Sequence, residues 1–286
     1  MIETIFQGLL LGGLYCIFAL GLSLMFGVMR LTNIALGDQI IISGFIAIGI
    51  AAILGLNVLL IGICILPIAF ISGYLFQRMV LNPTLSKDPL PSLVVTFGLS
   101  IVIQNVLQEV FSANPRSLDS GGLNTESFSI GADLHIGVLP VIIFITAIIC
   151  TYGLQLLFAK TALGRSFRAV SDDKEVAELM GMSAKKVYAT ATGIAFCLIA
   201  IAGVFQSMRT TVAPADGPSL LLFAFEAVII GGMGSFWGTF VGAMVLGISQ
   251  QIGFKFDPGW GIWFGHLVFI IILFIKPNGL FPKTKG

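Results

Sequence analysis

The chain contains repeated uninterrupted runs of apolar residues, and most of them are long enough to cross a membrane. About 17–25 apolar residues in a helix span a hydrocarbon core that is roughly 30 Å thick. Lipid offers no hydrogen-bond partners to the backbone, so a spanning segment must satisfy its own backbone groups, as a helix does. The runs therefore predict an all-α polytopic membrane protein.

The composition agrees with this prediction. Of the 286 residues, 57% are hydrophobic and only 10% are charged. A soluble domain has about one quarter charged residues, so this chain has too few to cover a water-facing surface. The formal net charge of +1 gives no reason to expect a nucleic-acid partner.

Hydropathy divides the chain into nine apolar segments. They lie near residues 5–29, 35–54, 57–78, 92–111, 136–159, 187–208, 220–233, 236–252 and 262–276. The short pair at 220–252 is split by GGMGS, and the 35–54 segment is a further candidate for a broken or re-entrant helix. We expect eight or nine crossings. The opening MIETIF carries no basic residue, so the first run is interpreted as a retained span and not a cleaved signal peptide.

The basic residues predict the orientation, because loops on the cytoplasmic side are enriched in Lys and Arg. If the segments alternate sides, one side receives Arg30, Arg78, Lys87, Lys160, Arg165, Arg168, Lys174, Lys185, Lys186, Lys276, Lys283 and Lys285. The other side receives only Arg116, Arg209 and Lys255. We therefore expect a cytoplasmic C-terminus, a cytoplasmic loop at 160–186 and a main external loop at 112–135.

One stretch of the cytoplasmic loop, AVSDDKEVAELMGMSAKKV at residues 169–187, is charged and has the signals of a short helix. Asp172 is the expected N-cap, and Glu175 stands three residues later, which is the spacing of a capping box. Gly181 is the expected helix stop, and Ser183 is expected to cap the following span.

This predicted helix has one apolar stripe, formed by Val176, Leu179 and Met180. A solvated loop that obeys the charge rule is one interpretation. A helix that docks on a membrane surface or in a protein groove is the other. Residues 172–180 carry four acidic residues and one Lys, which disfavours an anionic membrane surface and favours a protein groove.

Four stretches carry a resemblance to a known family. They are GGLYCIFALGLSLMFGVMRLTNIALGD (12–38), GRSFRAVSDDKEVAELMGMSAKKV (164–187), FEAVIIGGMGSFWGTFVGAMVLGI (225–248) and PNGLFP (277–282). Together with the order of the segments, they resemble the permease subunits of branched-chain amino acid ABC importers, a family that includes urea and short-chain amide transporters. The resemblance covers nearly the whole chain and implies a single permease domain at 1–286, in a bacterial cytoplasmic membrane.

The resemblance implies that the cytoplasmic loop seats a coupling helix in a cleft of an ATPase subunit. The residues expected to carry this contact are Gly164, Arg165, Arg168, Ala169, Asp172, Asp173, Glu175, Val176, Ala177, Leu179, Met180 and Gly181. The implied partners are a second permease (a related chain or another copy of this one), two ATPases and an external solute-binding protein.

The chain contains no G-x-x-x-x-G-K-[ST] motif for binding nucleotide phosphates. We therefore expect ATP and magnesium on the partner ATPases and no cofactor or metal in this chain. An integral-membrane enzyme is disfavoured, because no H-E-x-x-H or G-x-S-x-G motif is present.

Polar residues within apolar segments are costly and mark candidate functional sites. Glu226 is one such residue, with a position near the outer interface or a pair with Arg209 as the structural alternative. Asn33 and Asp38 flank the start of the second segment, where Asp38 is equally explained as an acid at a helix N-terminus. His266 is expected to be a hydrogen-bonded helix residue.

Further candidates for a substrate pathway are Thr96 and Gln104, for which hydrogen bonding between helices is the more common use. Gly231, Gly232 and Gly234 lie at the GGMGS break, and broken helices often line a translocation path. Most glycines, such as Gly8 and Gly12, are expected to serve close helix packing.

A self-contained secondary transporter or channel that uses Glu226 and Asp38 for ion coupling is the alternative function. It leaves the charged helix without a partner and predicts activity from this chain alone. The substrate expected from the resemblance is a branched-chain or other amino acid. Leu36 stands where the family commonly has His, and Glu226 where it often has an uncharged or small residue, so urea or a short amide stays open as a substrate.

Overall fold

The computed structural model describes the whole chain except residues 31, 56, 86–89, 131–133 and 282–286. Some residues used in the sequence analysis lie outside this described part, namely Lys87, Pro282, Lys283 and Lys285.

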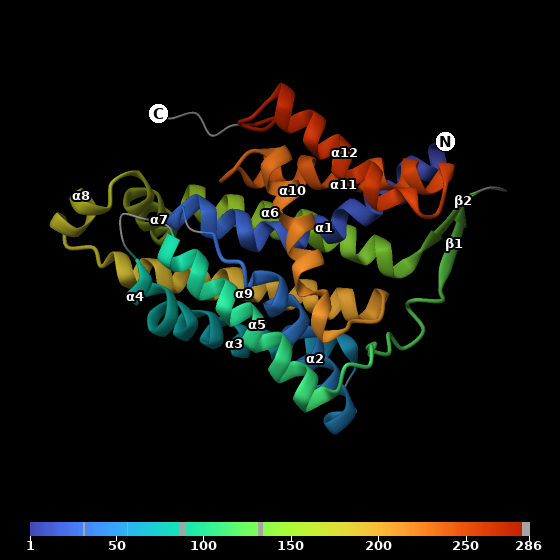
Figure 1. The fold of residues 1–286 in the computed structure, drawn as a ribbon, viewed down its shortest axis with the longest axis horizontal. Helices are drawn as coiled ribbons and strands as arrows, with labels where there is room; N and C mark the ends of the chain where they lie inside the picture. The colour runs from blue at the N-terminus through green and yellow to red at the C-terminus, as the bar shows by residue number, and fades with distance from the viewer. Residues whose placement is uncertain (31, 56, 86–89, 131–133, 282–286) are drawn as a thin grey trace.

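The described residues form a helical bundle with one small hairpin (Figure 1). The first half contains α1 (Ile2–Met29), α2 (Leu36–Leu54), α3 (Val58–Phe76), the π-helical segment η1 (Gln77–Leu81), α4 (Asn82–Thr84), α5 (Leu90–Phe111), β1 (Ser127–Ile130) and β2 (Leu134–Gly137). The second half contains α6 (Val138–Lys160), α7 (Ala162–Asp172), α8 (Lys174–Leu179), α9 (Ala184–Arg209), the 3-10 turn η2 (Pro214–Asp216), α10 (Gly217–Gly231), α11 (Phe236–Phe256) and α12 (Trp260–Ile275).

Each of the nine predicted apolar segments contains a helix, which confirms the predicted fold class. Seven of the described helical stretches are long and apolar enough to cross a membrane, and α12, with 16 residues, is shorter. The 35–54 segment is one continuous helix, α2, and not a broken one. The number of full crossings stays a prediction.

Helix α1 forms the centre of the bundle. In its most apolar window 89% of the residues are buried, against 28% for α5 and 22% for α6, whose outer faces are open. It packs on α11, α9, α6 and α10, and its contact with α11 is the most extensive between any two helices.

Glycine residues allow the backbones of α1 and α11 to lie in close contact. A Cβ at Gly12 would lie 2.7 Å from the Ala243 carbonyl oxygen and 2.9 Å from the Met244 Cα, and one at Gly247 would collide with the backbone of Gly8. Without a hydrophobic driving force between helices in lipid, such close van der Waals contact is a main source of association. The predicted packing role of Gly8 and Gly12 is confirmed.

The predicted external loop contains a feature that the sequence analysis did not predict. Strands β1 and β2 form an antiparallel hairpin in which Ser127 pairs with Gly137 and Ile130 with Leu134. Arg116 also bridges to Val212, which ties this loop to the chain after α9.

Several of the basic residues that the orientation argument assigns to one side, such as Lys160, Arg165 and Lys174, lie on or beside α7 and α8. Helices α7 and α8 lie at one end, and the N-terminus and the hairpin lie at the other (Figure 1). We call the end that carries α7 and α8 the basic end. Its assignment to the cytoplasm remains a prediction.

Replacing Gly12 by Val is expected to destabilise the bundle, because overpacking typically costs about 1–3 kcal/mol. The melting temperature of the purified protein in detergent should fall by several degrees. Gly98→Val is the matched control, since Gly98 is also helical but no atom lies within 4 Å of a Cβ built there. Equal melting temperatures for the two variants would contradict the packing role of Gly12.

Candidate functional site

Helix α7 is fixed to the end of α6. The Thr161 hydroxyl caps it by accepting a hydrogen bond from the Gly164 backbone N–H at 3.0 Å. A Cβ at Gly164 would collide with the backbone of Leu157 and Phe158. Arg168 donates a hydrogen bond from its guanidinium to the Phe158 carbonyl oxygen. Gly164 and Arg168, which were predicted to contact an ATPase, therefore hold α7 against the bundle.

Helix α7 also contacts the end of α1. The Ser171 hydroxyl donates to the Gly27 carbonyl oxygen at 2.8 Å. Gly27 in turn faces the break between α10 and α11, because a Cβ at Gly27 would lie 3.4 Å from the Gly234 Cα. One residue of α1 thus separates α7 from the GGMGS break.

The cap of α8 differs from the prediction. Asp172 is the last residue of α7, and Asp173 is the N-cap of α8, with its carboxylate accepting from the Val176 backbone N–H at 3.0 Å. The N3 position is therefore Val176, and Glu175 cannot complete a capping box. The predicted cap at Asp172 is wrong because α7 continues through that residue and the extended backbone falls one residue later.

Helix α8 exposes the predicted apolar stripe. The exposed fractions are 54% for Val176, 86% for Leu179 and 77% for Met180, whereas Ala177 is buried. Gly181 ends the segment with a φ of +85°, which a residue with a side chain rarely adopts. No described part of this chain covers these three apolar side chains.

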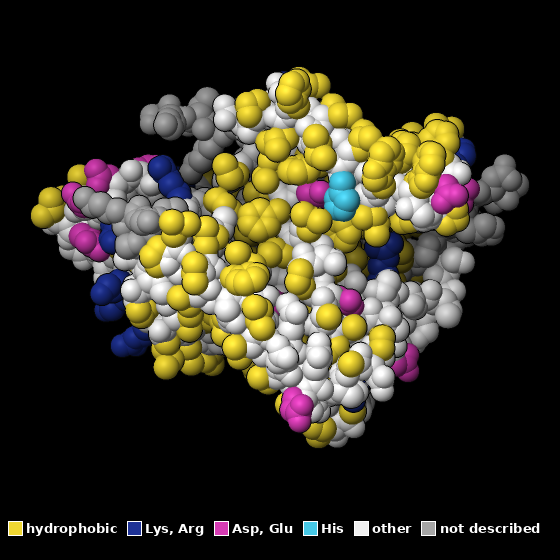
Figure 2. Space-filling model, viewed as in Figure 1, with side chains coloured by type: hydrophobic (Ala, Val, Ile, Leu, Met, Phe, Trp, Pro, Cys, Tyr) yellow, Lys and Arg dark blue, Asp and Glu magenta, His cyan; other side chains and the backbone are white. Residues whose placement is uncertain are grey.

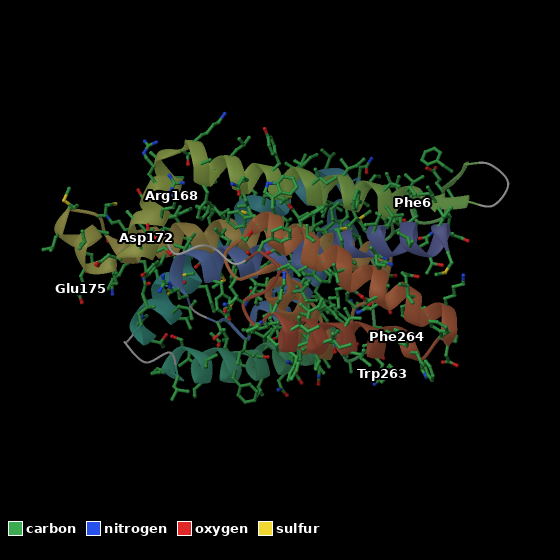
Figure 3. The ribbon with its side chains drawn as sticks, turned by 90° about the horizontal axis from the view of Figure 1, so that it is seen from above. Phe6, Arg168, Asp172, Glu175, Trp263 and Phe264 are labelled. Carbon is green, nitrogen blue, oxygen red and sulfur yellow. The ribbon has the colours of Figure 1, made fainter. Side chains whose placement is uncertain are left out.

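The other predicted coupling residues fall on the same two helices. Arg165 and Ala169 lie on α7, Asp172 ends it, and Glu175 lies on α8. Figure 3 places Arg168, Asp172 and Glu175 at one end of the molecule and Phe6, Trp263 and Phe264 toward the other. Ser183 is the N-cap of α9, as predicted, but its side chain makes no capping hydrogen bond.

A first buried polar cluster joins α2 to α5. Asp38 is 1% exposed, and its Oδ1 accepts from the Gln104 amide at 3.0 Å, while no donor reaches its Oδ2 within the described residues. The Thr96 hydroxyl accepts from the Ile34 backbone N–H at 3.2 Å. The Asn33 Oδ1 accepts a hydrogen bond from the Ala35 N–H. The buried Asn33 Nδ2 has no hydrogen-bond partner among the described residues.

A second buried polar cluster joins α1, α10, α11 and α12. Glu226 is 2% exposed, and its Oε1 lies 2.5 Å from the His266 Nδ1. The predicted hydrogen bond of His266 is confirmed, and this His, not Arg209, is the bonded partner of Glu226. The Tyr15 hydroxyl donates to the Gln250 Oε1 at 2.6 Å. Among the described residues, the Glu226 Oε2 and the Gln250 Nε2 have no hydrogen-bond partner.

Aromatic rings connect the two bonded pairs of this second cluster. The Phe223 ring stacks on Tyr15 with centroids 5.0 Å apart and on His266 with centroids 6.1 Å apart. Figure 2 shows the His side chain beside an acidic one in the middle of a largely hydrophobic face. Sequence reasoning did not select Tyr15 or Gln250, although both are polar groups inside apolar segments, the same signal that selected Glu226.

The break between α10 and α11 is a tight turn. Gly231 ends α10, and Gly232 and Gly234 have φ values of +103° and +80°. The C-terminal PNGLFP motif closes over this turn: the Leu280 N–H donates to the Ile230 carbonyl at 2.8 Å, and the Phe281 N–H to the Gly231 carbonyl at 3.0 Å. Two of the four motifs that carry the family resemblance thus meet in space.

Helix α10 links several of the predicted pathway residues. Its first residue, Gly217, lies directly against the Asp38 carboxylate, so that a Cβ there would collide with it. Glu226 stands in its middle, and Gly231 at its end. In Figure 1, α10 runs across the direction of the long helix α1, and so connects the first cluster, the second cluster and the glycine turn.

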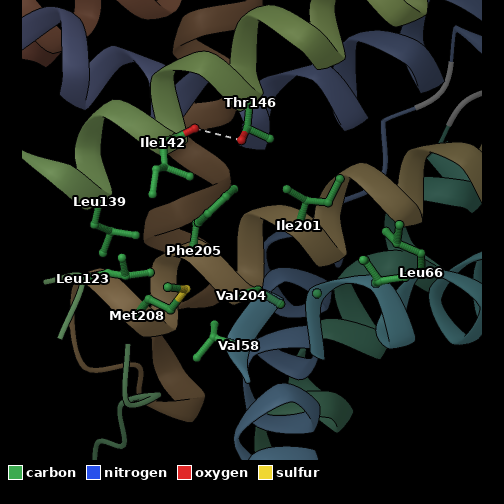
Figure 4. A pocket seen from close by; sticks show the side chains of 12 residues that line it. Val58, Leu66, Leu123, Leu139, Ile142, Thr146, Ile201, Val204, Phe205 and Met208 are labelled. Carbon is green, nitrogen blue, oxygen red and sulfur yellow. Dashed lines mark hydrogen bonds between the residues drawn. The ribbon is translucent and has the colours of Figure 1, made fainter. Parts of the chain in front are cut away.

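A separate apolar cavity of about 220 Å³ lies between α3, α6 and α9 (Figure 4). Its walls include Leu66, Ile142, Phe205 and Met208, and the Thr146 hydroxyl on its wall donates to the Ile142 carbonyl oxygen at 2.8 Å. It contains neither polar cluster, and Thr146 is the one polar side chain among its described lining residues.

Comparison with known proteins agrees with the arrangement. The family model described as "Branched-chain amino acid transport system / permease component" matches residues 4–276. The high-affinity branched-chain amino acid transport system permease protein BraD of Pseudomonas aeruginosa is 26% identical over 99% of this chain and 96% of its own length. The corresponding protein LivH of Escherichia coli K12 is 23% identical over the same shares.

The fold also resembles a solved structure, PsaBC from Streptococcus pneumoniae in complex with Fab. The TM-score is 0.50 with 14% identity, over 96% of this chain and 93% of that one. Since the family model covers nearly the whole chain and the relatives match end to end, this chain belongs to the branched-chain amino acid transport system permease family.

Proposed function

We propose that this protein is the membrane-spanning permease subunit of an ATP-driven importer and that α7 and α8 couple it to a separate ATPase. The observation that carries the proposal is the exposed stripe of Val176, Leu179 and Met180 on a helix whose two neighbours are fixed. An exposed apolar patch on a well-anchored element is typical of a protein–protein contact.

The anchoring of α7 supports a mechanical role. Its bonds to Phe158 on α6 and to Gly27 on α1 join the proposed docking helix to two long helices of the bundle. A force applied to α8 is therefore passed to spans and not absorbed by a loose loop. The energy must come from a partner, since this chain has no P-loop.

The pathway is proposed to follow α10. Its two clusters each hold a carboxylate with one oxygen that has no partner among the described residues, at Asp38 and Glu226. A buried carboxylate oxygen without a donor is costly, and the ammonium group of an amino acid would satisfy it. Relatives named for branched-chain amino acids favour that substrate class over urea and amides.

The proposed assembly contains a second permease (a related chain or another copy), two ATPases and an external binding protein, in a bacterial cytoplasmic membrane with α8 on the cytoplasmic side. Basic residues at the α7–α8 end support this orientation. The aromatic residues Trp260 and Trp263 gather at the other end, as interfacial side chains do.

Replacing Leu179 and Met180 together by Asp should detach the ATPases, because burying two carboxylates in an apolar cleft is strongly unfavourable. Co-purification of the cognate ATPases is expected to fall at least tenfold, with an unchanged melting temperature of the permease. Lys174→Asp is the control, since it changes the charge of the same helix by the same amount at an exposed polar position. ATPase binding equal to the wild type in the double variant would rule out the docking assignment.

Glu226→Gln should impair uptake more than assembly, because Gln retains a hydrogen-bonding group toward His266 but loses the charge that would hold an ammonium group. Leucine uptake by the reconstituted complex should fall about tenfold or more, as expected for a lost charge-assisted hydrogen bond. Glu109→Gln, the same change at an exposed residue of α5, should leave uptake unchanged. Wild-type uptake kinetics in Glu226→Gln would make Glu226 a structural residue.

A further inference from the structure

A second cavity, of about 430 Å³, opens at the basic end between α3, α4 and α9. Unlike the cavity of Figure 4, it is lined largely by polar side chains. The residues that matter for its chemistry are Tyr74, Arg78, Asn82, Ser183, Lys185 and Lys186. Three cations and no acid are among the described residues that line this space.

Among the described residues, no acid forms an ion pair with the cations of this cavity. In the part of the chain that the structure describes, the one ion pair joins Glu226 and His266, so Arg78, Lys185 and Lys186 have no acidic partner. All three are exposed. Three unpaired cations around one cavity favour an anionic ligand.

The backbone on the α3 side of the cavity has an uncommon conformation. The π-helical segment η1 lies between α3 and α4, and π-helical turns occur frequently at functional sites. Its first residue, Gln77, is fully buried, accepts from the Thr192 hydroxyl at 2.7 Å and donates to the Asn82 Oδ1 at 3.1 Å. The Asn82 side-chain amide in turn donates a hydrogen bond to the Lys185 carbonyl oxygen at 3.4 Å. This bonded chain sets α4 against α9 and shapes the wall between the cations.

An apolar stripe leads along α3 to the cavity. Ile68, Ile71, Leu75 and Met79 are 49%, 58%, 45% and 71% exposed, and their spacing of three, four and four residues puts them on one face. Tyr74 lies beside the end of this stripe, where an amphipathic ring suits the boundary between hydrocarbon and headgroups. Figure 2 shows hydrophobic side chains beside a group of basic side chains at the left of the view, near the place of α4 in Figure 1.

We propose that this cavity binds the headgroup phosphate of an anionic phospholipid from the leaflet at the basic end. Arg78, Lys185 and Lys186 hold the phosphate, Asn82 lines the same wall, and one acyl chain lies along the α3 stripe. The stripe identifies the ligand as a lipid. A soluble anion would bind the cations alone, whereas a lipid also has an acyl chain that packs along the apolar stripe. Since Lys185 and Lys186 lie in the first turn of α9, just after the coupling segment, the bound lipid holds the end of α9 that follows α8.

Native mass spectrometry of the full chain, released from detergent with added phosphatidylglycerol or phosphatidylcholine, tests the site. The wild type should retain phosphatidylglycerol in preference to phosphatidylcholine. In the variant with Arg78, Lys185 and Lys186 all replaced by Gln, this preference should fall about fivefold for each cation removed. That factor corresponds to the usual binding free energy of one basic residue near an anionic surface. A control variant with Lys160, Lys174 and Lys276 replaced by Gln loses the same charge and should retain the preference.

Photo-crosslinking of the unmodified protein gives a result that does not depend on the variants. A phosphatidylglycerol with a diazirine near its headgroup, in vesicles, should label peptides within 68–83 or 183–189. Excess inorganic phosphate should not reduce the labelling. Equal lipid retention by the two triple variants, labelling confined to other helices, or full competition by inorganic phosphate would each overturn the proposal.

Discussion

The close approach of backbones at glycine is the interaction on which this bundle depends. Gly8, Gly12 and Gly247 bring α1 against α11, and the same device brings Gly231 against Gly238 and Gly37 against Gly217. In lipid, helices gain little from hiding apolar side chains, so contact area and backbone proximity decide which helices associate. A central α1 surrounded on most sides follows directly from this pattern, and it leaves α10 free to run across the bundle with polar residues on it.

Much of the architecture was predictable because membrane helices are specified by length and apolarity, both of which are visible in one sequence. The segments, their helical character, the helix stop at Gly181 and the exposed stripe of α8 agree with the structure. The details that depend on one residue were less accessible. Two adjacent acids, Asp172 and Asp173, are equally good caps, and only the tertiary contacts of α7 decide which one lies beyond its end.

Partner choice inside the membrane was the least predictable feature. The sequence alone leaves several polar groups as possible partners of Glu226. The packing of α12 on α10 selects His266, which is 40 residues away. The hairpin of β1 and β2 lies in a loop whose strands are only four residues long, too short for a periodic signal to stand out. The closure of the glycine turn by the C-terminal motif likewise joins segments that are far apart in sequence and leave no local trace.

The placement of Gly27 has a consequence for how motion can travel. This residue receives the Ser171 hydroxyl on one side and lies against Gly234 on the other. Because Gly27 has no side chain, the backbone of α1 lies directly between α7 and the glycine turn at the end of α10. Under the proposed function, a displacement of α7 would reach the glycine turn through the backbone of Gly27, and a bulkier residue at position 27 would push α7 and the turn apart.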